Sequence, residues 1–174
     1  MRSGHGSHQT GLDADIWLTP APPQRLSSAE RDTLSAEPVV RADGNHVDSE
    51  RWTSNHITLL RMASGFAEVD RIFVNPATKR ALCDQVDGDR RWLAKVRPWW
   101  GHDAHMHVRL HCPDGDVACV KQDPVPAGDG CDAGLDWWFG DEARAELARR
   151  RATPLPKLTL SDLPSACRAV LLAP

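Results

Sequence analysis

The chain has 174 residues, 26% charged and 41% hydrophobic, which is typical of one globular domain with a sizeable core. Its net charge of −3 excludes a strongly basic protein that binds nucleic acid through bulk electrostatics. No apolar run approaches the ~18–20 residues that a membrane-spanning helix needs. We therefore expect a single domain over residues 1–174.

The first half of the chain predicts two strands and several short helices. Alternating side chains predict a strand over residues 12–18, with Asp13, Asp15 and Trp17 on one face. Residues 19–52 read as a long surface segment with one short helix near residues 28–34. A helix is expected over residues 55–63, capped by Ser54 or Asn55, and a strand over residues 69–74. Further helices are expected over residues 76–83, with proline first, and over residues 89–96.

The second half predicts one more strand and a long loop. Residues 105–111 alternate, which places His105, His107, Arg109 and His111 on one face. Residues 112–134 are dense in Cys, Gly, Pro and Asp and predict a loop. A helix over residues 141–151 has an acidic start and an arginine-rich end, and a last helix is expected over residues 161–172. We predict an α+β fold, in which a small antiparallel sheet carries the site and helices and long loops lie around it.

The histidines are concentrated where the predicted strands could bring them together. His105 and His107 share one strand face, so both can reach a common site. Gly11 permits a sharp bend between His8 and the strand of Asp15, so these two side chains could converge on one ion. Two imidazoles and one carboxylate are a sound ligand set for catalytic zinc, which lowers the pKa of bound water toward ~7. Exposed polar alternation remains the alternative explanation of each pattern taken alone.

Two long blocks of the chain are RSGHGSHQTGLDADIW at residues 2–17 and KVRPWWGHDAHMHVR at residues 95–109. Both closely resemble the penicillin-insensitive murein endopeptidase family, a branch of the lysostaphin-type, D-Ala-D-Ala and hedgehog-like zinc domains. The shared pattern is a His, six residues, an Asp, and later a His-x-His. Weaker similarity extends through the Asn-Pro at residues 75–76 and the cysteine-rich loop.

The resemblance implies a role for each matching residue. His8, Asp15 and His107 would bind one Zn²⁺. His105 would act as general base beside the attacking water or stabilise the transition state, and His102 would hydrogen-bond the water or the developing oxyanion. His5 would lie behind the ligands or contact substrate. Asp13 is expected either to orient a ligand histidine or to be a solvated acid. Trp100 would line the site or pack as a structural residue.

The implied activity is hydrolysis of the D-alanine–meso-diaminopimelate cross-links of peptidoglycan in the periplasm, by direct attack of water and therefore without sensitivity to penicillin. The implied partners are stem peptides and no nucleic acid, and a homodimer stays open. Three alternatives remain: a zinc-containing binding module, an inactive fragment, and a D-Ala-D-Ala carboxypeptidase. The last usually has a Glu near the position of His105, which disfavours it here.

The five cysteines favour an oxidising compartment, yet the first residues contain no apolar stretch typical of a signal peptide. Spacing and the resemblance together suggest the disulfides Cys112–Cys119 and Cys83–Cys131, although spacing alone does not determine connectivity. Cys167 would be left unpaired. Because the family's first motif begins at residue 2, we expect that an N-terminal part of the domain, with a partner for Cys167, is missing from this chain.

Overall fold

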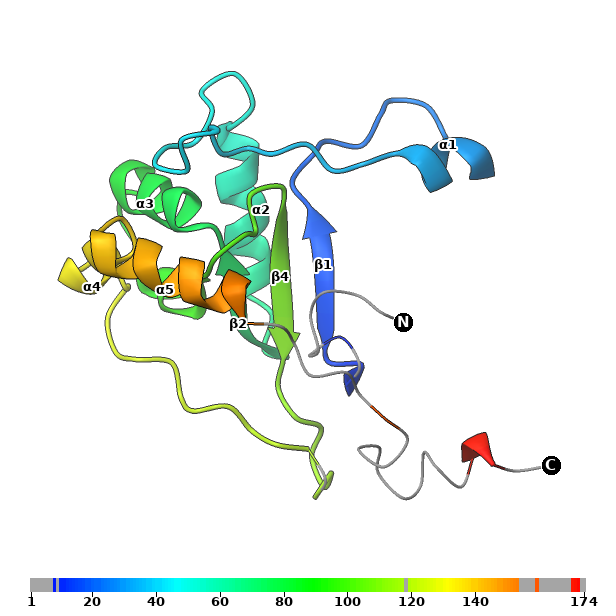
Figure 1. Ribbon diagram of the computed structural model, residues 1–174. Helices are drawn as coiled ribbons and strands as arrows, with labels where there is room; N and C mark the ends of the chain where they lie inside the picture. Colours follow the sequence, from blue (N-terminus) through cyan, green and yellow to red (C-terminus); the bar gives the residue numbers. More distant parts are fainter. Residues whose placement is uncertain (1–7, 9, 118, 154–158, 160–169, 173–174) are drawn as a thin grey trace.

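A four-stranded mixed sheet in the order β1-β4-β2-β3 lies at the centre of the fold. The computed structural model describes residues 8, 10–117, 119–153, 159 and 170–172 (Figure 1). Within these residues the elements, in chain order, are β1 (Asp13–Trp17), α1 (Ser28–Thr33), α2 (Ser54–Ser64), β2 (Val69–Val74), α3 (Pro76–Gln85), the 3₁₀ helix η2 (Arg91–Lys95), β3 (Val96–Pro98), β4 (His105–Leu110), α4 (Ala133–Trp137) and α5 (Asp141–Ala152). This arrangement confirms the predicted α+β class.

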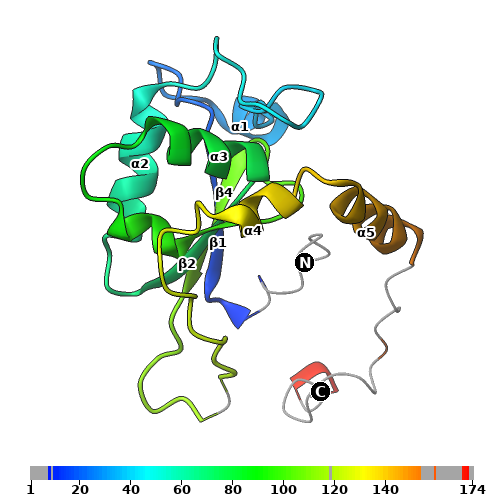
Figure 2. The same ribbon diagram turned by 90° about the vertical axis from the view of Figure 1, so that its left-hand side faces the viewer.

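The two faces of the sheet have different environments. Met106 of β4 and Ile72 of β2 are fully buried and pack in one core with Leu60 of α2 and Leu82 of α3. Figures 1 and 2 show α2 on one side of the sheet and α5 on the opposite side. Because side chains alternate along β4, its histidines occupy the face opposite to Met106. The core therefore covers one face of the sheet and leaves the other for polar groups.

The edge strand β1 is only partly covered. It pairs antiparallel with β4 alone, and Ile16, on the face predicted to be apolar, is 41% exposed. The buried end of that face is Leu18, whose carbonyl oxygen accepts a hydrogen bond of 2.9 Å from His56 Nε2 in α2. The link between the edge strand and the helical layer is thus concentrated at the end of β1.

Most predicted elements are confirmed, and the differences have local causes. β2 matches its predicted span, and α3 begins at Pro76 as expected, with the Asn75 side chain accepting from Ala77 N. The helix α2 begins at Ser54, one residue early, because Thr53 takes the N-cap position. The prediction of a helix over residues 89–96 is wrong in type, since a 3₁₀ turn there runs into β3. β3 pairs parallel with β2, so the sheet is not purely antiparallel.

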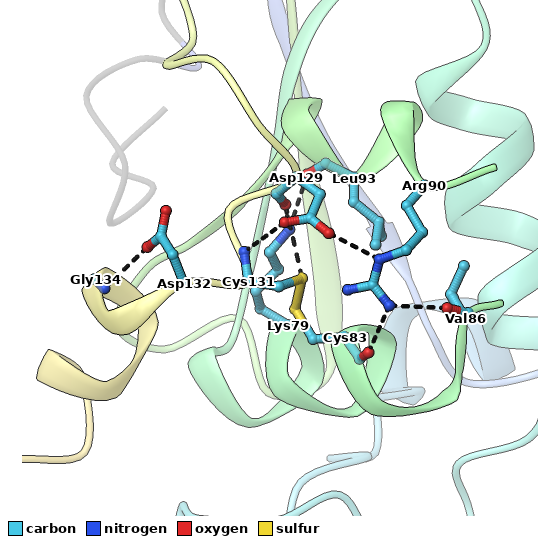
Figure 3. Close-up of a disulfide and its surroundings, with 9 residues drawn as sticks. All are labelled: Lys79, Cys83, Val86, Arg90, Leu93, Asp129, Cys131, Asp132 and Gly134. Atoms are coloured by element: carbon cyan, nitrogen blue, oxygen red, sulfur yellow. Dashed lines mark hydrogen bonds and ion pairs between the residues drawn. A yellow bond between two sulfur atoms is a disulfide. The ribbon is translucent and has the colours of Figure 1, made fainter. Parts of the chain in front are cut away.

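The segment before α4 is attached to α3 by a disulfide and by hydrogen bonds (Figure 3). The structure forms both expected disulfides, Cys83–Cys131 and Cys112–Cys119. Beside the first, the fully buried Lys79 donates to the carbonyl oxygens of Leu93, at 2.8 Å, and Asp129, at 2.6 Å. Arg90 donates to the Asp129 carboxylate at 2.8 Å.

The remaining predictions on the C-terminal part have mixed outcomes. The loop predicted from residue 112 continues to Asp132, where the side chain caps α4, and Figure 1 shows it extending away from the sheet. The expected last helix over residues 161–172 lies almost wholly outside the described residues, as does Cys167. Among the described helices, none has the length and apolar character required to cross a membrane.

Candidate metal centre and its neighbourhood

The strand register brings three site residues to one place. β1 runs antiparallel to β4 with Asp15 opposite His107 and Trp17 opposite His105. Gly11, with a φ of 74°, turns the chain back so that the side chain of His8 reaches that of Asp15. A side chain on an L-residue disfavours this left-handed backbone, which explains a glycine there. His8 and Asp15 therefore meet His107, which comes 92 residues after Asp15 in the sequence.

These three side chains have the geometry of a metal site. One ligand atom from each lies within 4.8 Å of the others. The distance from His8 Nε2 to Asp15 Oδ2 is 3.2 Å, and from His107 Nδ1 to Asp15 Oδ1 it is 3.0 Å. Tetrahedral zinc with bonds of about 2.0–2.1 Å separates its ligand atoms by about 3.3 Å. The two distances to Asp15 match this separation, which makes the three side chains a candidate metal site.

Asp13 lies directly behind His107. Its Oδ1 is 2.8 Å from His107 Nε2, and its Oδ2 accepts a hydrogen bond from Arg109. An ionised carboxylate only accepts, so His107 Nε2 donates to Asp13; a neutral ring with its proton on Nε2 has its lone pair on Nδ1, where a metal ion between Nδ1 and Asp15 would accept it. The Asp13 side chain is 1% exposed, so this carboxylate is held by its partners and not by water.

His105 and His102 lie beside the three ligand candidates. His105 Nε2 is 3.7 Å from Asp15 Oδ1, and the ring centroids of His102 and His105 are 5.0 Å apart. His102 is 4% exposed, and its Nδ1 donates to the carbonyl oxygen of Trp100 at 2.9 Å. With the Nδ1 proton engaged in this way, the neutral ring has its lone pair on Nε2, through which His102 can accept a hydrogen bond or a proton.

A strained loop presents His102. Its φ of 52° makes His102 the single non-glycine residue with positive φ in the described part of the chain, and Gly101 before it has a φ of 69°. Asn75 holds this pair, because its backbone N donates to His102 O and its Nδ2 donates to Gly101 O at 2.8 Å. Backbone strain of this kind costs about 1–3 kcal/mol and is concentrated at functional sites.

An aromatic wall adjoins the imidazoles. Phe73 lies opposite His107 in the β2–β4 register, with ring centroids 5.8 Å from His107 and 6.4 Å from His102. On its other side Phe73 is 5.8 Å from Trp99, which begins a cluster with Trp100, Trp137 and Trp138. Trp100 contributes its carbonyl to His102, and its ring packs within this cluster.

Sequence reasoning missed Phe73 and Arg109 as members of this neighbourhood. The alternation of β2 places Phe73 on the polar face, but only its pairing with β4 shows that it contacts His107. Arg109 shares a strand face with His107, which was visible in the sequence, while its pairing with Asp13 depends on the β1 register. His111, by contrast, lies beyond β4, pairs with Asp70 at 3.4 Å and is 55% exposed. His5 lies outside the described residues.

The chain resembles known proteins along nearly its whole length. The family model described as "Penicillin-insensitive murein endopeptidase" matches residues 1–172. A protein of that name from Klebsiella pneumoniae subsp. pneumoniae is 46% identical over 171 residues, covering 98% of this chain and 60% of the relative. Relatives of the same name from Pectobacterium atrosepticum and Yersinia enterocolitica are 46% and 45% identical, covering 97% of this chain and 58% of their own lengths. The chain thus spans about three-fifths of these relatives.

Proposed function

Because this chain belongs to the penicillin-insensitive murein endopeptidase family, we propose that it is a zinc-dependent endopeptidase that hydrolyses the D-alanine–meso-diaminopimelate cross-links of peptidoglycan in the periplasm. The observation that carries the proposal is the convergence of His8, Asp15 and His107, with His105 and His102 beside them. A zinc ion bound by these three side chains would lower the pKa of water and polarise the scissile carbonyl.

The protein's own groups would perform the proton transfers. His105 would take the proton of the attacking water and return it to the leaving amine, as a general base and then a general acid. His102, whose Nδ1–H is fixed on Trp100 O, would accept a hydrogen bond from the attacking water through the lone pair on Nε2, or, as an imidazolium, would offer Nε2–H to the oxyanion that develops on the carbonyl. Asp13 would keep His107 in the tautomer whose Nδ1 binds metal. No serine or cysteine is acylated in this scheme, so penicillin has no nucleophile to block.

The test is cleavage of purified cross-linked muropeptide dimers with and without a chelator. We expect conversion of dimers to monomers, loss of activity on chelation and recovery with added zinc. Release of a terminal D-alanine without dimer cleavage would indicate a carboxypeptidase. An absence of any zinc-dependent turnover would contradict the proposal and favour a binding module or an inactive fragment.

Two variants and one control assign the roles. His107→Ala should lose both zinc binding and cleavage. His105→Ala should retain zinc while the turnover falls about 10²–10⁴-fold, the usual contribution of a general base. His111→Ala removes an exposed imidazole just beyond β4 and should behave like the parent. Cleavage by His105→Ala at the parent rate would exclude His105 as the base.

A further inference from the structure

A groove separate from the metal centre lies between α5, the loop over residues 38–51 and the loop that presents His102. Its volume is about 760 Å³. Trp100, Gly101 and Asp103 line it, so the residues on both sides of His102 face this groove. The same short loop therefore forms a wall of the groove and supplies a histidine to the metal centre, which makes the groove a neighbour of the reacting site.

The helix α5 contacts the tryptophans beside this groove. The guanidinium of Arg150 lies 4.7 Å from the ring centroid of Trp100, and Trp100 and Trp138 are also 4.7 Å apart. Trp100 and Trp138 both line the groove. Aromatic surfaces of this kind are rigid and favour contact with the carbon skeleton of a ligand.

The groove carries charges of both signs. Its lining includes four arginines and three aspartates, so its charge is mixed and does not resemble a polyphosphate site. Arg41–Asp43 and Arg51–Asp48 form long contacts of 3.9 Å each. Pairs of this length contribute little stability. Arg51 also donates to Pro38 O, and Asp43 and Asp48 accept from backbone nitrogens, so these four groups are partly engaged within the loop.

Two charges of the lining are not used by the fold. Among the described residues, neither Arg151 of α5 nor Asp103 of the His102 loop takes part in an ion pair, and both side chains are exposed. One is a cation and the other an anion, and they come from different walls of one groove. A ligand that bears both a carboxylate and an ammonium group would be complementary to them.

We propose that this groove binds a peptide arm of murein, with Arg151 receiving an ionised carboxylate and Asp103 receiving an ammonium group of the diamino-acid residue. The inference rests on the proposed function, because murein stem peptides are the ligands with this pair of charges that the metal centre would cut. It adds a binding site that holds the substrate strand beside the His102 loop.

The first experiment measures binding without hydrolysis. The zinc-loaded full chain is titrated with an uncross-linked murein stem tetrapeptide, which has no cross-link to cut, and binding is followed by calorimetry. We expect Arg151→Gln and Asp103→Asn each to weaken binding about tenfold, as for loss of one charge-assisted contact. Arg91→Gln makes the same charge change at a side chain that is 91% exposed, lies outside the groove lining and pairs with Asp89, so it should bind like the parent.

Chemically blocked peptides assign each charge. Amidating the peptide carboxylates should weaken binding to the parent but should not weaken binding to Arg151→Gln any further. Acetylating the peptide amine should weaken binding to the parent but should not weaken binding to Asp103→Asn any further. With cross-linked dimers, Arg151→Gln should raise KM about tenfold and leave kcat within about twofold, because Arg151 touches no reacting atom.

The outcomes separate this inference from the proposed function. Dimer cleavage with an unchanged KM in Arg151→Gln, or equal peptide binding by the parent and both variants, overturns the groove assignment and leaves the endopeptidase proposal standing. Charge-dependent peptide binding without any dimer cleavage supports the groove and contradicts the endopeptidase. Circular dichroism and thermal unfolding of each variant show whether a loss of peptide binding comes from misfolding. If a variant is misfolded, the comparison of free and blocked peptides on the parent protein tests the groove assignment.

Discussion

Asp13→Asn is the substitution that most directly tests how the metal centre is held. It removes a negative charge that is 1% exposed and that accepts hydrogen bonds from both His107 and Arg109. Asparagine keeps the shape and one acceptor oxygen, but its NH₂ group replaces the second acceptor with a donor. One of the two partners must therefore lose its hydrogen bond.

The structure predicts two separable losses. Removing a partner that orients a ligand histidine lowers metal affinity about 10–100-fold, or about 1.4–2.7 kcal/mol. In the described part of the chain Asp13 is the one carboxylate paired with Arg109, whose side chain is 9% exposed. Leaving a buried charge without its partner costs about 3–5 kcal/mol. The free energy of unfolding of the metal-free protein should therefore fall by about 3 kcal/mol.

The assays measure each loss alone. Zinc affinity is obtained by competition with a chromophoric chelator, and stability by urea unfolding in the presence of excess chelator. Asp136→Asn is the matched control, because Asp136 is 77% exposed and its ion pair with Arg80 should contribute no more than about 1 kcal/mol.

A double substitution identifies the cause. In an Arg109→Met background no buried cation is left unpaired when Asp13 is changed, so Asp13→Asn should lower the free energy of unfolding much less there. The loss of zinc affinity should persist in this background, because it acts through His107. A zinc affinity within twofold of the parent in Asp13→Asn would refute the orienting role. If Asp13→Asn no longer lowers the zinc affinity in the Arg109→Met background, the loss of affinity in the single variant would be due to general disruption of the fold.

Two further predictions concern stability away from the metal centre. Burial, followed by the charge of Arg97, lowers the pKa of Lys79 to about 7. Above pH 7 the Lys79 amine is therefore protonated in the unfolded chain and largely neutral in the folded chain. The free energy of unfolding should accordingly rise between pH 7 and pH 9, by at most about 1.4 kcal/mol per pH unit. Urea unfolding of Lys79→Met over this range should show a flatter rise, and parallel curves would contradict the assignment. The disulfide Cys83–Cys131 spans 48 residues and Cys112–Cys119 spans 7, so loop-closure entropy predicts losses of about 4 and about 2.5 kcal/mol when each pair is changed to alanine. Unfolding measurements that reverse this order would show that loop length does not dominate.

Elements with strong local signals could be predicted from the sequence. Alternation alone places the histidines of β4 on one face, and Asn75-Pro76 marks the start of α3, because a capping side chain and a fixed proline φ act within a few residues. The strand faces of Asp15, His105 and His107 were readable in the same way, while the family motif supplied their pairing and the inclusion of His8 and His102.

Features that depend on strand partners could not be predicted in this way. β3 has three residues and reads locally as the end of a helix, and it becomes a strand because β2 offers it a parallel edge. Phe73 became part of the site through its register with His107. Hydrophobic alternation shows which face a residue takes, whereas the cross-strand partner is determined by the topology of the whole sheet.

The placement of His102 shows how far such long-range determination extends. The strained backbone at residues 101–102 is held by the backbone and side-chain nitrogens of Asn75, whose side-chain oxygen at the same time caps α3 through Ala77 N at 2.9 Å. The helix start and the loop conformation therefore depend on one side chain, with both ends of its amide in use. A helix-capping signal in the sequence is local, but here it also fixes a candidate catalytic histidine 27 residues later. Because the opposite side of that loop lines the groove, a ligand bound against Asp103 would press on a segment that α3 already holds in position.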